Sequence, residues 1–234
     1  MKILIAGDSW GCGVWGPGSG PSHPFRGLKH KGIEQFLVDD GHDVINVSYG
    51  GASNFDTIKR MEPLVYRYNY DYIFYIKTDP LRELYPAGTT EDNTSNDKLH
   101  FPNYERILYT IDYNSNSCYE MLNKMGVPIH MIGGCGTINE MLLEKYSNLK
   151  LVLKSIPKYL CPNYTIPEVW FSSDWYKNID EKWDLSNIDK VLEQQRRVEW
   201  LNKNCKHFKD DHAHPDKDGY FKVYQYIKEN VLLK

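Results

Sequence analysis

Residues 2–10 of the chain read Lys-Ile-Leu-Ile-Ala-Gly-Asp-Ser-Trp, and this stretch decides the fold. The apolar run over residues 2–6 is continuous rather than alternating, which is typical of a parallel strand that is buried on both faces. Gly7 then predicts a tight turn that carries Asp8 and Ser9. Because α/β proteins bind their ligands at the carboxyl ends of such strands, this turn is the first candidate for a functional site.

Further strands and helices alternate along the chain. Short apolar or β-branched runs predict strands at 43–48, 70–77, 127–132 and 151–153. Helix-like spacing and capping residues predict helices at 27–40, 53–66, 104–125, 138–146, 185–204 and 219–233. This alternation predicts an α/β fold, a three-layer αβα sandwich with a central parallel sheet of about five strands.

The domain organisation follows from the length of 234 residues and from the absence of a repeat or a clear linker. We expect a single domain over residues 1–234, with loop insertions near 11–26, 84–102 and 155–184. These insertions are rich in Gly, Pro or polar residues, and such loops often build a substrate pocket.

Charge and cysteine usage exclude several classes of function. The formal charge of −3 gives no reason to expect a nucleic-acid partner. No signal peptide and no membrane-spanning run is apparent, so we expect a cytoplasmic protein without a membrane partner. The five cysteines are scattered and contain no CxxC pair, which favours free thiols over a disulfide framework or a structural zinc site. The sequence does not indicate an oligomeric state.

A second polar cluster, Asp-His-Ala-His over residues 211–214, is followed by Pro215 and precedes the last predicted helix. A carboxylate at Asp211 can orient the ring of His214, whose other nitrogen can then accept a proton from a serine hydroxyl. We therefore expect Ser9 as nucleophile, His214 as base and Asp211 as its orienting partner. This interpretation requires the two ends of the chain to meet.

Three blocks of the sequence carry a family resemblance. Gly7–Trp10, Asn46–Ser48 followed by Gly51, and Asp211–Tyr220 resemble the blocks of the SGNH/GDSL hydrolases, in the same order and over nearly the whole chain. The resemblance implies a flavodoxin-like fold and a serine ester hydrolase that needs no metal or organic cofactor. It also implies an oxyanion donor at the Gly51 amide, and a small or carbohydrate-linked acyl ester as substrate.

The sequence departs from the family pattern in its third block. Where the family reads Gly-x-Asn-Asp, residues 76–79 read Ile-Lys-Thr-Asp, so that Thr78 stands at the position of the asparagine. The missing donor could be the Thr78 hydroxyl or the amide of Asn54, which could equally cap the following helix. A catalytically weak or inactive domain of the same fold, which binds a glycan or a partner protein, is therefore the alternative function.

Three further patterns have competing interpretations. Residues 11–16 match the dinucleotide motif G-x-G-x-x-G, but Pro17 and further glycines follow where that motif requires a helix. A metal site formed by Asp210, Asp211, His212 and His214 competes with the proposed roles of Asp211 and His214. We expect His207 and His212 to be exposed, and Asp8 to bond backbone N–H groups under the Ser9 turn.

Overall fold

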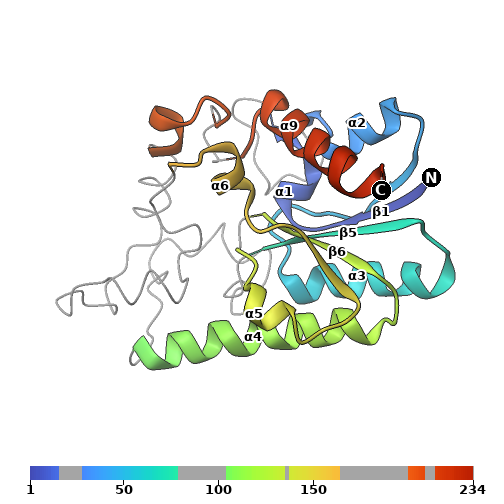
Figure 1. Cartoon of the computed structure of the whole chain (residues 1–234), viewed down its shortest axis with the longest axis vertical. Coiled ribbons are helices and arrows are strands. Elements are labelled where there is room, and N and C mark those ends of the chain that lie inside the picture. The colour runs from blue at the N-terminus through green and yellow to red at the C-terminus, as the bar shows by residue number, and fades with distance from the viewer. Residues whose placement is uncertain (16–27, 79–103, 135–136, 164–199, 209–213, 234) are drawn as a thin grey trace, which may run out of the picture.

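The computed structural model describes residues 1–15, 28–78, 104–134, 137–163, 200–208 and 214–233. The predicted insertion at 84–102 lies outside the described residues, as do 16–26 and 164–184 of the other two insertions (Figure 1). The single-domain organisation with these insertions stays a prediction.

The core of the fold is a parallel sheet in the order β4-β1-β5-β6-β7. Its strands are β1 (Lys2–Ala6), β4 (Asp43–Asn46), β5 (Tyr72–Lys77), β6 (Ile129–Gly133) and β7 (Leu149–Leu153). Numbered within the sheet, the order is 2-1-3-4-5, which is the flavodoxin-like arrangement. All five predicted strands are confirmed, and the apolar run at the N-terminus forms β1, which pairs with both β4 and β5.

Helices cover both faces of the sheet, which confirms the three-layer αβα sandwich (Figure 1). One layer contains α2 (Ile33–Asp39), α6 (Ile156–Leu160) and α9 (Lys217–Ile227), and the other contains α3 (Asn54–Arg67), α4 (Tyr104–Lys124) and α5 (Glu140–Leu143). Alternate side chains of each strand point to opposite layers. In β1, Ile3 and Ile5 pack toward the first layer, while Leu4 and Ala6 pack toward the second.

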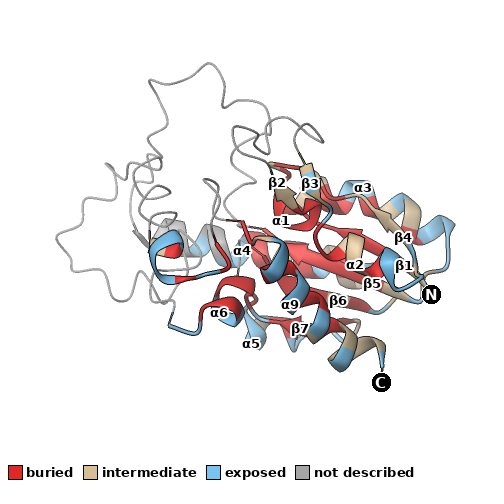
Figure 2. Cartoon of the chain, turned by 90° about the horizontal axis from the view of Figure 1, so that it is seen from above, coloured by how far each residue is buried: buried red, intermediate tan, exposed pale blue. Residues whose placement is uncertain are grey.

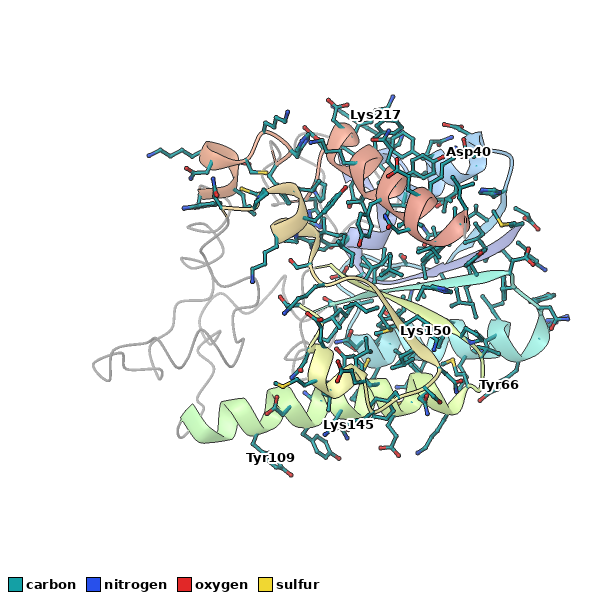
Figure 3. All side chains as sticks on the ribbon, viewed as in Figure 1. Asp40, Tyr66, Tyr109, Lys145, Lys150 and Lys217 are labelled. Atoms are coloured by element: carbon teal, nitrogen blue, oxygen red, sulfur yellow. The ribbon has the colours of Figure 1, made fainter. Side chains whose placement is uncertain are left out.

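Burial of the sheet on both faces explains the continuous apolar runs in the sequence. The strands are mostly buried, and the exposed residues lie on the outer sides of the helices (Figure 2). Tyr66 on α3 and Tyr109 on α4 point away from the sheet and are 64% and 69% exposed (Figure 3). Among the described residues, none of the helices combines the length and apolar character needed to cross a bilayer.

The region after Ser9 differs from the prediction. We expected a loop over 11–24 and a helix from residue 27, but the structure contains a short helix α1 (Ser9–Cys12) followed by β2 (Val14–Trp15). β2 pairs antiparallel with β3 (Leu28–His30), and α2 begins only at Ile33. Strands of two and three residues are too short for hydrophobic periodicity to indicate them.

Helices toward the C-terminus also differ from the prediction in extent. The helix expected over 138–146 is limited to α5, and α6 lies in a segment that we expected to be irregular. Ser155 caps α6 by accepting the Lys158 N–H, and Pro157 is tolerated because it lies in the first helical turn. Of the helix expected over 185–204, only 200–204 are described and are helical. α9 begins two residues earlier than expected and continues into a π-helix, Lys228–Leu232.

Gly13 and Gly41 both have positive φ angles, +124° and +82°, but their surroundings differ. A Cβ atom on Gly13 would lie 2.2 Å from the carbonyl oxygen of His30, whereas one on Gly41 would have no atom within 4 Å. We predict that Gly41→Ala lowers the free energy of unfolding by about 1–2 kcal/mol through φ strain alone. Gly13→Ala should lower it by about 3 kcal/mol or more, because the backbone of the β2–β3 pair must also move.

Urea unfolding of the two variants and the wild type measures this difference. Equal losses for Gly13→Ala and Gly41→Ala would contradict the close approach of Gly13 to β3.

Candidate active site

Ser9 is positioned by the turn that leaves β1, an interior strand of the sheet. Gly7 is required there, because a Cβ atom would lie 2.8 Å from Cβ of Ile76 on the neighbouring strand. Asp8 is fully buried and caps α1, with its Oδ1 atom accepting the backbone N–H of Trp10 at 3.0 Å. This is the backbone role that the sequence predicted for Asp8, and it leaves Ser9 as the first residue of α1.

The side chains of Ser9 and His214 are in direct contact. The Nε2 atom of His214 lies 2.8 Å from Oγ of Ser9, although the two residues are 205 positions apart. Ser9 is 1% exposed and His214 is 4% exposed. A hydrogen bond with so little surrounding water is electrostatically stronger than an exposed one. The structure therefore brings together the N-terminal hydroxyl and the C-terminal imidazole that the sequence paired.

His214 is held in place by contacts between α1 and α9, which lie side by side over the end of β1 (Figure 1). The ring of Trp10 packs against the ring of His214, with their centroids 5.5 Å apart. Tyr220, in the first turns of α9, donates its hydroxyl to the carbonyl oxygen of Trp10 at 3.0 Å. Sequence reasoning assigned no role to Trp10 or Tyr220, because an aromatic residue beside a motif carries no sign of its tertiary partner.

His207 was expected to be exposed, and this prediction is wrong. Its exposed fraction is 5%, and its carbonyl oxygen accepts the backbone N–H of Asp216 at 2.8 Å. Burial is the main cause that lowers the pKa of His207, and the positive charge of Lys222 acts in the same direction. His207 therefore favours its neutral form, and its backbone fixes the start of α9 close to His214. A single histidine in a polar stretch gave no periodic signal of this burial.

Asp211 lies outside the described residues, as do Asp210 and His212, so the predicted orienting carboxylate and most of the competing metal site cannot be compared with the structure. Within the part of the chain that the structure describes, no group of three or more His, Cys, Asp or Glu residues could hold a metal ion.

Gly51 lies in a turn at the same edge of the sheet as Ser9. The N–H of Ala52 donates to the carbonyl oxygen of Tyr49 at 3.1 Å, and Gly51 occupies the position of this turn that needs a positive φ, here +77°. The N–H of Tyr49 in turn donates to the carbonyl oxygen of Gly7 at 3.1 Å. The loop that carries Gly51 is therefore joined directly to the turn that carries Ser9.

The side chains of Thr78 and Asn54, the two predicted oxyanion donors, both form hydrogen bonds within the fold. The hydroxyl of Thr78 donates to Oδ2 of Asp8 at 2.6 Å. A hydroxyl has a single proton, so in this arrangement Thr78 has none left for an oxyanion. The amide of Asn54 pairs with the backbone of Thr78, accepting its N–H at 3.1 Å and donating to its carbonyl oxygen at 3.2 Å. Ser53 rather than Asn54 caps α3.

Gly11 and Gly13 of the G-x-G-x-x-G match have structural roles, and Gly16 lies outside the described residues. A Cβ atom on Gly11 would lie 2.2 Å from Oγ of Ser48, and Gly13 packs closely against β3. A dinucleotide site needs a helix that opens at these glycines. The described residues contain the opposite arrangement, because α1 ends at Cys12 and a strand follows.

Similarity to known proteins is found among solved structures. No protein-family model matches the chain, and no curated protein matches it. Similar solved structures include the acetyl xylan esterase AlAXEase, with 12% identity, a TM-score of 0.45 and coverage of 99% of this chain and 100% of that chain. A protein assigned to the lipolytic G-D-S-L family in Desulfitobacterium hafniense DCB-2 has 12% identity, a TM-score of 0.46 and coverage of 97% and 98%. A Clostridium thermocellum family 3 carbohydrate esterase has 11% identity, a TM-score of 0.45 and coverage of 99% and 94%.

These similarities identify no substrate. The chain's own flavodoxin-like strand order, 2-1-3-4-5, and the serine that follows β1 agree with the fold and the Ser9 turn that the resemblance to the SGNH/GDSL hydrolases implied. The chain has an α/β fold with a flavodoxin-like strand order.

The hydrogen bond between Thr78 and Asp8 can be tested by substitution. Thr78→Val keeps the shape of the side chain but leaves the buried Asp8 carboxylate without this donor, so we predict a loss of about 1.5–3 kcal/mol in the free energy of unfolding. Thr78→Ser retains the hydroxyl and should lose less than half of that amount. Urea unfolding measures both variants, and a Thr78→Val protein as stable as Thr78→Ser would show that the hydrogen bond contributes nothing.

Proposed function

We propose that the chain is a serine ester hydrolase of the SGNH/GDSL type, which acts on a small or carbohydrate-linked acyl ester through an acyl-enzyme intermediate. The 2.8 Å contact between Ser9 Oγ and His214 Nε2 is the observation that carries this proposal. A serine hydroxyl becomes a useful nucleophile when a neutral imidazole within hydrogen-bond distance can take its proton.

In the proposed reaction, Ser9 Oγ attacks the acyl carbonyl carbon while His214 Nε2 accepts the hydroxyl proton. The tetrahedral intermediate collapses, His214 returns the proton to the leaving alcohol, and the acyl group stays on Ser9. A water molecule then attacks the acyl-enzyme, with His214 again acting as base and then as acid. The carboxylic acid leaves and Ser9 regains its proton.

The remaining roles are assigned by sequence and position. Asp211 would orient His214 and stabilise its charged form during each proton transfer. The backbone N–H of Gly51 would donate to the oxyanion, and the junction between its loop and the Ser9 turn supports this role. Thr78 would act through Asp8, as a positioning residue for the turn that carries Ser9.

A catalytically weak or inactive domain that binds a glycan or a partner is the second candidate function. Two observations favour it: the Thr78 hydroxyl is engaged by Asp8, and Ser9 is only 1% exposed. In a comparable hydrolase, removal of one oxyanion donor costs about 3–4 kcal/mol of transition-state stabilisation. Such a loss would leave a slow enzyme rather than no enzyme.

Hydrolysis of p-nitrophenyl acetate by the wild type and by Ser9→Ala separates the two candidates. We predict that the wild type turns over and that Ser9→Ala loses turnover by about 10³-fold or more, because the nucleophile is gone. Ser147→Ala, a substitution of an exposed serine far along the chain, should retain wild-type turnover. Activity that survives Ser9→Ala, or a wild type that does not hydrolyse p-nitrophenyl acetate, would reject the hydrolase.

Substitutions of His214 and of Asp211 should lower kcat by different amounts. His214→Ala removes the base, and we expect kcat to fall by about 10³-fold or more. Asp211→Asn should cost less if His214 keeps its orientation, and the loss should appear in kcat rather than in KM, because the carboxylate acts on the base and not on the substrate. Steady-state kinetics of both variants test whether His214→Ala lowers kcat more than Asp211→Asn does. A wild-type kcat in Asp211→Asn would show that Asp211 has no role in the mechanism.

A further inference from the structure

Cys161 and Cys205 face each other across two segments that are distant in sequence. Cys161 follows α6 directly, and Cys205 follows the helical residues 200–204, which lie next to α6 (Figure 1). The Sγ atom of Cys205 lies 3.6 Å from the carbonyl oxygen of Leu160, and the Sγ atom of Cys161 lies 3.9 Å from that of Asn204. Each thiol therefore reaches the residue that precedes the other cysteine.

The two side chains are close enough to affect each other. Both are thiols in the structure and both are buried, with exposed fractions of 6% and 4%. Burial, together with a hydrogen bond to the thiol of Cys205, raises the pKa of Cys161 to about 11. Little of Cys161 is therefore the reactive thiolate at neutral pH.

The pair is linked through Phe208 and Trp10 to His214. The N–H of Phe208 donates to the carbonyl oxygen of Cys205 at 3.2 Å, and the ring of Phe208 packs against Trp10 with centroids 6.1 Å apart. Trp10 in turn packs against His214. A covalent bond at Cys205 would thus fix this segment to α6, on which the start of α9 also packs.

We propose that Cys161 and Cys205 are the site of a disulfide bond that forms when the chain meets a small-molecule disulfide such as oxidised glutathione. This inference does not depend on the proposed reaction of Ser9. One protein thiolate attacks a sulfur of the small disulfide, whose S–S bond breaks to release one thiol and leave a mixed disulfide. The second protein thiolate then attacks the protein sulfur and releases the other thiol. The two protein thiols lose two electrons, and the small disulfide gains them with the two protons.

The bond would close a covalent loop from residue 161 to residue 205. Such a cross-link restricts the unfolded chain and stabilises the folded one when the native geometry accepts it. The scattered positions of the cysteines in the sequence could not indicate this pairing, because residues 44 positions apart become neighbours only when α6 and the 200–204 helix pack together.

Mass spectrometry of the full chain tests the proposal directly. The protein is incubated with oxidised glutathione at about pH 8.5, because the thiolate is the form that attacks a disulfide, and is then alkylated and digested without reduction. We expect a linked pair of peptides that contain Cys161 and Cys205 and that separate on reduction. Alkylation of both residues, glutathione on either of them as the final product, or a bond from either to another cysteine would overturn the proposal.

Two variants provide a matched control in thermal unfolding. Oxidation should raise the Tm of the wild type by about 5 °C or more. Cys118→Ser changes a buried cysteine in the other helical layer and should keep the whole oxidation-dependent shift. Cys205→Ser should abolish that shift, whatever its own starting Tm, and a shift that persists in Cys205→Ser would contradict the assignment.

Discussion

The contact between Ser9 and His214 depends on the burial of β1 in the middle of the sheet. β1 has a hydrogen-bonded neighbour on each side and helices on both faces. The position of Ser9, just beyond the carboxyl end of β1, is therefore fixed. The first turns of α9 then lie over the end of β1, with Tyr220 bonded to the carbonyl oxygen of Trp10. A hydroxyl from one end of the chain and an imidazole from the other meet because Ser9 begins α1 and His214 lies just before α9, and both helices pack in the same layer.

The buried side chain of Asp8 stabilises the turn that carries Ser9. Asp8 accepts a hydrogen bond from the backbone of α1 with one oxygen and from Thr78 with the other. The position at which the SGNH/GDSL hydrolases resemble this chain least is therefore the position that holds the Ser9 turn to β5. The hydroxyl of Thr78 therefore stabilises the turn that carries Ser9.

The sequence predicted the sheet well because parallel strands that are buried on both faces leave an unambiguous apolar run. It also predicted the Ser9–His214 contact, since parallel strands share one carboxyl edge and the last helix begins beside it. It failed where tertiary contacts alone decide the outcome. The β2–β3 pair is too short to show a hydrophobic period. His207 is buried by packing against the start of α9. The hydroxyl of Thr78 donates to Asp8. None of these partners is adjacent in the sequence.

The central claim is that Ser9 is an activated nucleophile, and covalent labelling measures this most directly. A fluorophosphonate probe reacts with a serine that has a base beside it and leaves other serines unmodified. Intact-mass and peptide analysis of the labelled chain should give one adduct, located on Ser9, and the adduct should be absent from His214→Ala protein. Labelling at another serine, or no labelling of a folded wild type, would contradict the account.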